Sequence, residues 1–135
     1  METTTKTNTQ AVQECFGYFG AGNIPALLNE LTGDVKWISP QVPGLPWSGD
    51  REGKAAVADF FKLLGENAEF LAFEPREFFE KGNKVVCLGY GKMKSKKTGK
   101  MTENDWVMTF TFKGNKISHF QEYVNTYAGY EAFKP

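Results

Sequence analysis

Apolar residues in the first half of the chain recur at helical spacing. A first helix is expected from Thr9 to Gly20, because the i, i+3, i+4, i+7 positions of one face carry Val12, Cys15, Phe16 and Phe19. Asn23 is a suitable N-cap for a short second helix with leucines on one side. A third helix is expected after Ser48 or Asp50, and its apolar face would consist of Val57, Phe60, Phe61 and Leu64.

Alternating segments predict the strands. Residues 34–39 alternate in polarity, and prolines then exclude regular structure up to Trp47. Four longer strand-like stretches follow, divided by turn sequences, at 69–80, 84–95, 101–112 and 116–127. The predicted order is therefore α-α-β-α-β-β-β-β, an α+β fold in which an antiparallel meander packs against three N-terminal helices.

The stretch 101–112 has two clearly different faces. Its bulky residues share one parity and should face the helices: Trp106, Met108, Phe110 and Phe112. The other parity carries Val107, Thr109 and Thr111, which is mildly apolar and suits packing against a second copy. We therefore expect a homodimer formed through the outer sheet face.

The last strand-like stretch has two mixed faces. One parity carries His119, Gln121, Tyr123 and Asn125, and the other carries Phe120, Glu122 and Val124. The sequence does not decide which set faces inward; if the first set lies beside Trp106 and Met108, its imidazole, amide and phenol groups converge in an aromatic chamber typical of a small-molecule site. The alternative is that these groups are ordinary core polar residues that bond to one another.

Composition and charge narrow the possible partners. Sixteen basic and sixteen acidic residues give no net charge, which argues against nucleic acid, and the lysines around Thr98-Gly99 fit a solvated hairpin tip. Twenty aromatic residues, the sum of 12 Phe, 3 Trp and 5 Tyr, suffice for a core that encloses a pocket. A polar start and the lack of a long apolar run predict no signal peptide, no membrane span and a cytoplasmic location.

Length and cysteine use point to one simple domain. The 135 residues divide into an expected flexible tail, 1–9, and a single domain, 10–135. Cys15 and Cys87 show neither metal-ligand nor disulfide spacing, and the chain has one histidine, so we expect buried thiols, no metal and no cofactor.

Several segments resemble the SnoaL-like branch of the NTF2-like superfamily. They are 45–61, from Leu-Pro-Trp-Ser-Gly-Asp, 73–78, 106–110 and Glu122-Tyr-Val-Asn125. The resemblance implies a cone in which a strongly curved antiparallel sheet wraps a long helix, with a pocket between them and dimers formed through the outer face. Its members include polyketide cyclases, ketosteroid isomerase, limonene epoxide hydrolase and non-catalytic binding proteins, so the fold leaves the function open.

The chain departs from the family at the positions that carry chemistry. The acid/base carboxylate of the family motif Glu-Tyr-x-Asp falls on Asn125, which cannot take a proton at neutral pH. The position of the isomerase base falls on Ser39, a hydroxyl with no base beside it in the sequence. The catalytic residues of the epoxide hydrolases include an arginine between two aspartates. The two arginines of this chain are Arg51 and Arg76, and neither lies on the strands expected to supply that set.

Candidate site residues follow from these comparisons. For catalysis we consider Asn125 and Tyr123, which could polarise a carbonyl, and His119, which could move a proton beside Glu103 or Asp105. Trp47 is expected to close the pocket from the proline-rich loop. The full set of expected ligand-binding residues is Phe16, Phe19, Trp37, Ser39, Trp47, Phe60, Trp106, Met108 and Gln121.

Two functional hypotheses remain open at this stage. The protein binds a small apolar cyclic or carbonyl-bearing molecule and acts on it with isomerase- or cyclase-like acid/base chemistry. Alternatively, it is a non-catalytic ligand-binding or protein-interaction dimer module. A titratable group inside the pocket would favour the enzyme, and a pocket lined only by amide, phenol and aromatic groups would favour binding.

Overall fold

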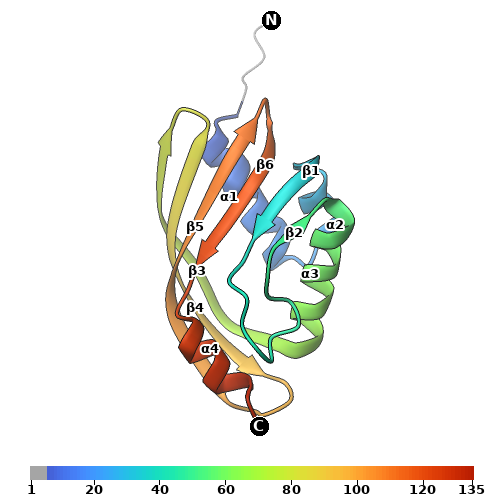
Figure 1. The fold of residues 1–135 in the computed structure, drawn as a ribbon. Helices are drawn as coiled ribbons and strands as arrows, with labels where there is room; N and C mark the ends of the chain where they lie inside the picture. The colour runs from blue at the N-terminus through green and yellow to red at the C-terminus, as the bar shows by residue number, and fades with distance from the viewer. Residues whose placement is uncertain (1–5) are drawn as a thin grey trace, which may run out of the picture.

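A curved six-stranded sheet wraps one side of the helices in the computed structural model, which describes residues 6–135 (Figure 1). The helices are α1 (Asn8–Gly20), α2 (Ile24–Leu28), α3 (Lys54–Asn67) and α4 (Thr126–Phe133). The strands are β1 (Leu31–Ile38), β2 (Arg51–Glu52), β3 (Ala68–Lys81), β4 (Lys84–Ser95), β5 (Met101–Lys113) and β6 (Lys116–Tyr123). The predicted α+β class is confirmed, and the structure adds the short β2 and the C-terminal α4.

Local capping explains where the N-terminal helices begin. Thr7 and Gln10 form a capping box at the start of α1, so residues 8 and 9 of the expected tail belong to the helix and Thr7 caps it. Residues 1–5 lie outside the described part. The Asn23 side chain caps α2 as predicted. In contrast, α3 begins after Gly53 rather than at Ser48 or Asp50, and no side chain caps it.

The sheet is mixed, which corrects the prediction of a purely antiparallel sheet. Strands β3 to β6 form the predicted meander, and the strand order is β2-β1-β6-β5-β4-β3. β1, however, lies parallel to β6, with Trp37 opposite Phe120 and Ile38 opposite Gln121. The sequence pattern of a single strand does not show the direction of its partner, so this arrangement could not be predicted from alternation alone.

A β-bulge in β6 decides which set of residues in the last strand faces inward. Thr111 pairs with His119 and Phe112 pairs with Ile117, so Ser118 has no partner position on β5. Ile117 faces inward before the bulge, and the extra residue turns the even-numbered residues inward after it. The inner set is therefore Phe120, Glu122 and Val124, while His119, Gln121 and Tyr123 lie on the outer face of the sheet.

The last strand is also shorter than predicted, because α4 follows it. β6 ends at Tyr123, and the side chain of Asn125 accepts a hydrogen bond from the backbone N–H of Ala128 as the N-cap of α4. α4 packs against the proline-rich loop, where the rings of Trp47 and Phe133 meet edge to face with centroids 5.0 Å apart. The loop and α4 together cover one end of the space between sheet and helices.

Both cysteines are buried, as predicted, and neither forms a disulfide. Burial raises the pKa of the Cys15 thiol to about 12 and that of the Cys87 thiol to about 11. Both side chains are therefore neutral packing groups at physiological pH.

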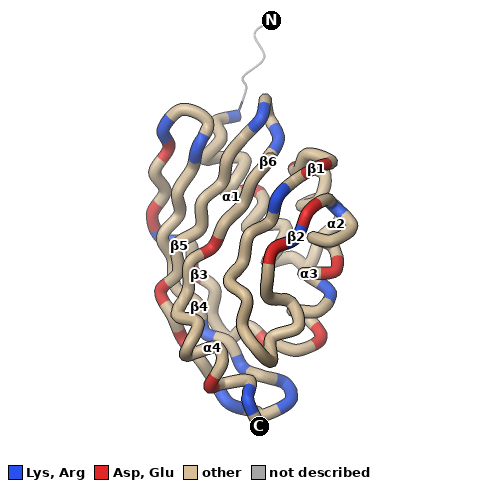
Figure 2. The backbone as a smooth tube through the Cα atoms, in the orientation of Figure 1, with Lys and Arg blue, Asp and Glu red and all other residues tan. Residues whose placement is uncertain are grey.

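The lysines of the β4–β5 hairpin tip lie at the end of the molecule that holds the C-terminus (Figure 2). The ammonium group of Lys96 donates to the carbonyl of Gly65 near the end of α3, and that of Lys100 donates to the carbonyl of Lys134 after α4. Positive charge at helix C-termini is favourable, so this tip stabilises the fold. No helix among residues 6–135 is long and apolar enough to cross a membrane.

Candidate functional site

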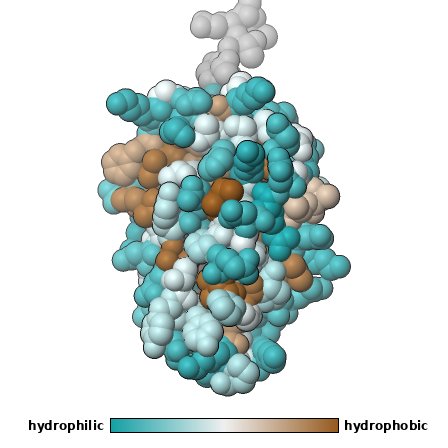
Figure 3. Space-filling model, viewed as in Figure 1, coloured by the Kyte–Doolittle hydropathy of each residue, from teal (hydrophilic) through white to brown (hydrophobic). Residues whose placement is uncertain are grey.

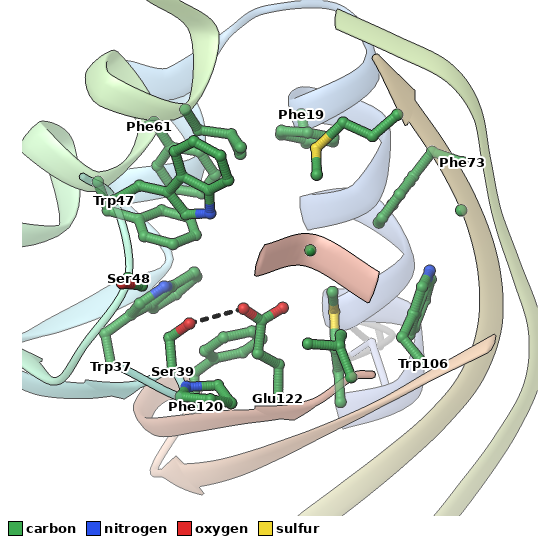
Figure 4. A pocket seen from close by; sticks show the side chains of 18 of the residues that line it. Phe19, Trp37, Ser39, Trp47, Ser48, Phe61, Phe73, Trp106, Phe120 and Glu122 are labelled. Atoms are coloured by element: carbon green, nitrogen blue, oxygen red, sulfur yellow. Dashed lines mark hydrogen bonds between the residues drawn. The ribbon is translucent and has the colours of Figure 1, made fainter. Parts of the chain in front are cut away.

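A cavity of about 170 Å³ lies between the inner face of the sheet, α1 and α3 (Figure 4). Its floor comes from β1 and β6, and one wall comes from β3 to β5. α1 and α3 contribute the aromatic rings of Phe16, Phe19, Phe60 and Phe61. The loop after β1 and the start of α4 contribute Trp47, Asn125 and Gly129. The lining is predominantly apolar and aromatic, as expected for a site that takes a small organic molecule.

Two stacked aromatic pairs form facing parts of the lining. Trp37 and Phe120, which are direct partners across β1 and β6, stack with centroids 3.9 Å apart and an interplanar angle of 21°. Phe73 and Trp106 stack with centroids 5.1 Å apart and an angle of 17°. Flat walls of this kind favour a flat ligand.

The position of Trp106 depends on two glycines of β4. Gly89 is its direct partner across β4 and β5, and a Cβ atom at Gly89 would overlap the Trp106 ring. A Cβ atom at Gly91 would lie 3.4 Å from the indole nitrogen. The two missing side chains therefore let the indole lie flat on the strand.

One carboxyl group faces this apolar cavity. The Ser39 hydroxyl donates a 2.7 Å hydrogen bond to Oε1 of Glu122 (Figure 4). The two residues follow the Trp37–Phe120 pair by two positions, at the point where the parallel strands β1 and β6 both end. Parallel pairing in register thus brings together two residues that are 83 positions apart in the sequence.

The surroundings of Glu122 change its acidity. Burial raises the pKa of the Glu122 carboxyl, and the hydrogen bond from Ser39 opposes this increase because it stabilises the charged form. A carboxyl group with a raised pKa inside a cavity is a candidate for acid/base chemistry. It can donate a proton to a ligand oxygen when neutral and accept one when ionised.

The structure brings most of the expected ligand-binding residues into one cavity. The residues that line it are Phe16, Phe19, Trp37, Ser39, Trp47, Phe60, Trp106 and Met108. Of the three residues considered for catalysis, Asn125 lines the same cavity while it caps α4.

The remaining expected residues lie on the outer side of the sheet. Tyr123 is 52% exposed and borders a second, shallow hollow together with Gln121. His119 pairs with Thr111 and Lys36 on the outer face. Glu103, considered as a partner for His119, instead accepts a hydrogen bond from the hydroxyl of Tyr90. None of these side chains lines the aromatic cavity, although Ser39 and Glu122 border both the cavity and the shallow hollow.

Sequence reasoning missed Glu122, although a signal was present. Its neighbours of the same parity, Phe120 and Val124, are both apolar, and a carboxylate between apolar residues on one strand face is unusual for a solvated position.

A second polar group, Thr102 with Asn104, also lines the cavity on β5. Among residues 6–135, no group of three or more His, Cys, Asp or Glu side chains could hold a metal ion.

Comparison with known proteins identifies the domain. The model of the family described as the SnoaL-like domain matches residues 12–120. None of the curated proteins compared with the chain matches it.

Solved structures with the same fold cover nearly the whole chain. An NTF2-like protein from Burkholderia xenovorans LB400 is 30% identical, with a TM-score of 0.87, and the match covers 98% of this chain and 100% of that one. An NTF2-like protein of unknown function from Burkholderia pseudomallei K96243 is 23% identical, with a TM-score of 0.87 and coverage of 97% and 100%. TerC, co-crystallised with polyporic acid, is 23% identical, with a TM-score of 0.80 and coverage of 95% and 98%.

Proposed function

The chain belongs to the SnoaL-like domain family, and we propose that it binds a flat, apolar, carbonyl-bearing molecule and catalyses proton transfer on it through Glu122. The observation that carries the proposal is the Ser39–Glu122 hydrogen bond of 2.7 Å inside an aromatic cavity. The co-crystal of TerC with polyporic acid supports a small-molecule ligand for this fold.

The proposed chemistry is reversible enolisation. The Glu122 carboxylate takes a proton from the carbon next to the ligand carbonyl, and the electron pair of that C–H bond moves toward the carbonyl oxygen. The carboxyl group then returns a proton to carbon, so the protein ends as it began. A raised pKa makes the carboxylate a stronger base than a solvated glutamate, which lowers the cost of this step.

Ser39 and Asn125 act as positioning groups in this proposal. The Ser39 hydroxyl holds Oε1 of Glu122, which leaves Oε2 to exchange the proton with the ligand. The carbonyl oxygen of the Asn125 side chain accepts from the backbone of α4, so its NH₂ group remains to donate to the ligand oxygen. Tyr123 and His119 have no part in this mechanism because they lie on the outer face.

Deuterium exchange into a cyclic ketone tests the proposal. β-Tetralone in D₂O serves as the probe, and proton NMR follows the loss of the signal next to the carbonyl. We expect Glu122→Gln to slow protein-catalysed exchange by about 100-fold or more, because general acid–base groups contribute factors of this size. The matched control is Glu66→Gln, which changes an exposed carboxylate on α3 and should keep the rate.

The binding and catalytic readings give different results in this experiment. If the wild type catalyses no exchange yet binds the ketone, the catalytic step is wrong and the non-catalytic ligand-binding alternative holds. If Glu122→Gln exchanges as fast as the wild type, the proton passes through another group.

We also infer that two copies associate through the outer face of the sheet. The cross-strand pairs Val107–Leu88 and Thr109–Val86 are half-buried there. In the view of Figure 3, small groups of apolar side chains lie among polar ones. We expect a dimeric mass in light scattering and a shift toward the monomer in Thr109→Lys, since a two-fold interface repeats the added charge. A monomeric wild type would contradict this inference.

A further inference from the structure

The cavity has a second polar group far along the sheet from Glu122. Residues of β5 with even numbers face inward, and Asn104 and Thr102 continue the row that begins with Met108 and Trp106. Asn104 lies opposite Gly91, whose missing side chain leaves space beside the amide, whereas Glu122 lies opposite Met108. Glu122 lies on β6 and Asn104 on β5, and four positions along β5 separate Asn104 from Met108, the partner of Glu122.

The hydrogen-bonding capacity of this group is only partly used. The amide nitrogen of Asn104 donates to the Thr102 hydroxyl over 3.4 Å, a long contact for a hydrogen bond. Within residues 6–135, the side-chain carbonyl of Asn104 accepts no hydrogen bond and the Thr102 hydroxyl donates none. Thr102 is only 8% exposed, and polar groups at such positions normally have partners. A ligand oxygen at this place would accept from the hydroxyl or donate to the carbonyl.

The separation of the two polar groups sets a length for the ligand. Four residues of an extended strand span about 14 Å, and the curvature of the sheet shortens the direct path. The stacked rings of Phe73 and Trp106 form the wall beside the row between them, and they offer a flat apolar surface. A molecule that contacts both groups is therefore elongated, flat and polar at its two ends.

We propose that Thr102 and Asn104 form a subsite that selects elongated aromatic ligands with a hydrogen-bonding oxygen at each end. One oxygen lies at Glu122 and Ser39, and the other lies at Asn104 and Thr102. This inference rests on the proposed function of the same cavity, and it names the class of molecule that the cavity takes: bifunctional polycyclic or biaryl phenols and ketones.

Two phenols that differ by one hydroxyl test the subsite. The probes are 4-hydroxybiphenyl and 4,4′-dihydroxybiphenyl, with affinities measured by calorimetry. We expect the wild type to bind the dihydroxy compound about fivefold to tenfold more tightly, a factor of the size that one neutral hydrogen bond contributes. Asn104→Leu, of nearly equal volume, should remove this preference, so that the ratio of the two affinities falls close to one.

Two further variants make the result specific. Thr102→Val keeps the shape of the side chain and should reduce the preference, which serves as a second measurement if Asn104→Leu folds poorly. Asn115→Leu, at an exposed position in the β5–β6 turn, should keep the full preference.

The outcomes separate this subsite from the proposed function. A preference that survives in both Asn104→Leu and Thr102→Val overturns the subsite, while loss of binding of both phenols in Glu122→Ala still supports the ligand cavity. Equal affinity of the wild type for the two phenols also overturns the subsite. If neither phenol binds the wild type, both the subsite and the proposed ligand class are wrong.

Discussion

The two stacked aromatic pairs of the cavity reach similar geometry in different ways. Trp37 and Phe120 are direct cross-strand partners, and their rings meet because β1 and β6 run parallel in register. Phe73 and Trp106 come from strands that are not neighbours, since β4 lies between β3 and β5. Their contact passes over β4, where glycines replace side chains.

This difference places the chemistry on one side of the cavity. Beside the Trp37–Phe120 pair, the next inward position on both strands is polar, and it holds Ser39 and Glu122. Beside Trp106, the facing positions of β4 have no side chains at all. The register of β1 and β6 therefore brings Ser39 and Glu122 together on the floor of the cavity. The wall beside Trp106 is apolar, because the facing positions of β4 are glycines.

The largest expected effect on stability comes from Trp106, whose packing depends on the glycines of β4. Trp106→Ala should reduce the free energy of unfolding by about 3–5 kcal/mol, as buried aromatic truncations do. Gly89→Ala should cost about 1–3 kcal/mol through overlap with the indole. In the double variant the cost of Gly89→Ala should disappear, because the overlapping ring is gone. Denaturant unfolding measures all three values.

Two other glycines control this experiment. Gly33→Ala in β1 places its Cβ in open space and should change stability little, and Gly91→Ala should cost less than Gly89→Ala. An additive double variant would mean that Trp106 does not lie on Gly89.

An intermediate effect on stability is expected from Glu122 on the floor of the cavity, and this effect depends on pH. Its pKa is raised in the folded protein, so the folded state holds its proton at pH values where the unfolded state has released it. The stability contributed by this group is therefore full at low pH and declines as pH rises through the unfolded and then the folded pKa. Glu122→Gln should remove this decline and be relatively more stable than the wild type above neutral pH. Thermal unfolding from pH 4 to 8 measures the difference.

The paired residue refines that result. Ser39→Ala removes the hydrogen bond that lowers the pKa of Glu122, so its stability should decline more steeply with pH than that of the wild type. Parallel pH curves for the wild type and Glu122→Gln would show that Glu122 is solvated like an ordinary carboxylate.

The smallest effect concerns Trp47, which belongs to neither pair. Its ring lies in the cavity lining and meets Phe133 of α4. Ligand binding should quench its fluorescence, and Trp47→Phe should remove most of that quenching with little loss of affinity. If the full signal remains, Trp37 or Trp106 reports the ligand instead.

Much of the fold could be predicted because its pattern is strong. Along β5, the bulky residues Trp106, Phe110 and Phe112 alternate with smaller ones, and the structure buries the bulky set as predicted. The two faces of β6 do not differ in this way, and its orientation depends on the bulge at Ser118. No residue type in the sequence indicates that bulge. α4 was missed because its eight residues include one glycine and two tyrosines and give a weak helical pattern, although Asn125 is a good N-cap.

The candidate site could be predicted in its apolar part only. The apolar face of each helix or strand can be recognised from its own periodicity, and aromatic residues on that face point inward. Phe16, Trp37 and Phe60 were therefore expected in the cavity, and they line it. The Ser39–Glu122 pair depends on two strands at opposite ends of the sequence and on a parallel register. The family motif drew attention to Asn125, while the carboxyl group lies three residues earlier.

The parallel pairing of β1 with β6 also affects how the chain folds during synthesis. Apart from β6, the only strand that pairs with β1 in the described residues is the two-residue β2. β1 therefore joins the main sheet only after β6 has been made. Ribosomes add about 5–20 residues per second, and the 83 positions between Ser39 and Glu122 therefore correspond to roughly 4–17 s. During that interval the apolar side of β1 can be covered only by the helices already made. Synthesis of the last strand thus completes the sheet and the reactive pair in one late, non-local step.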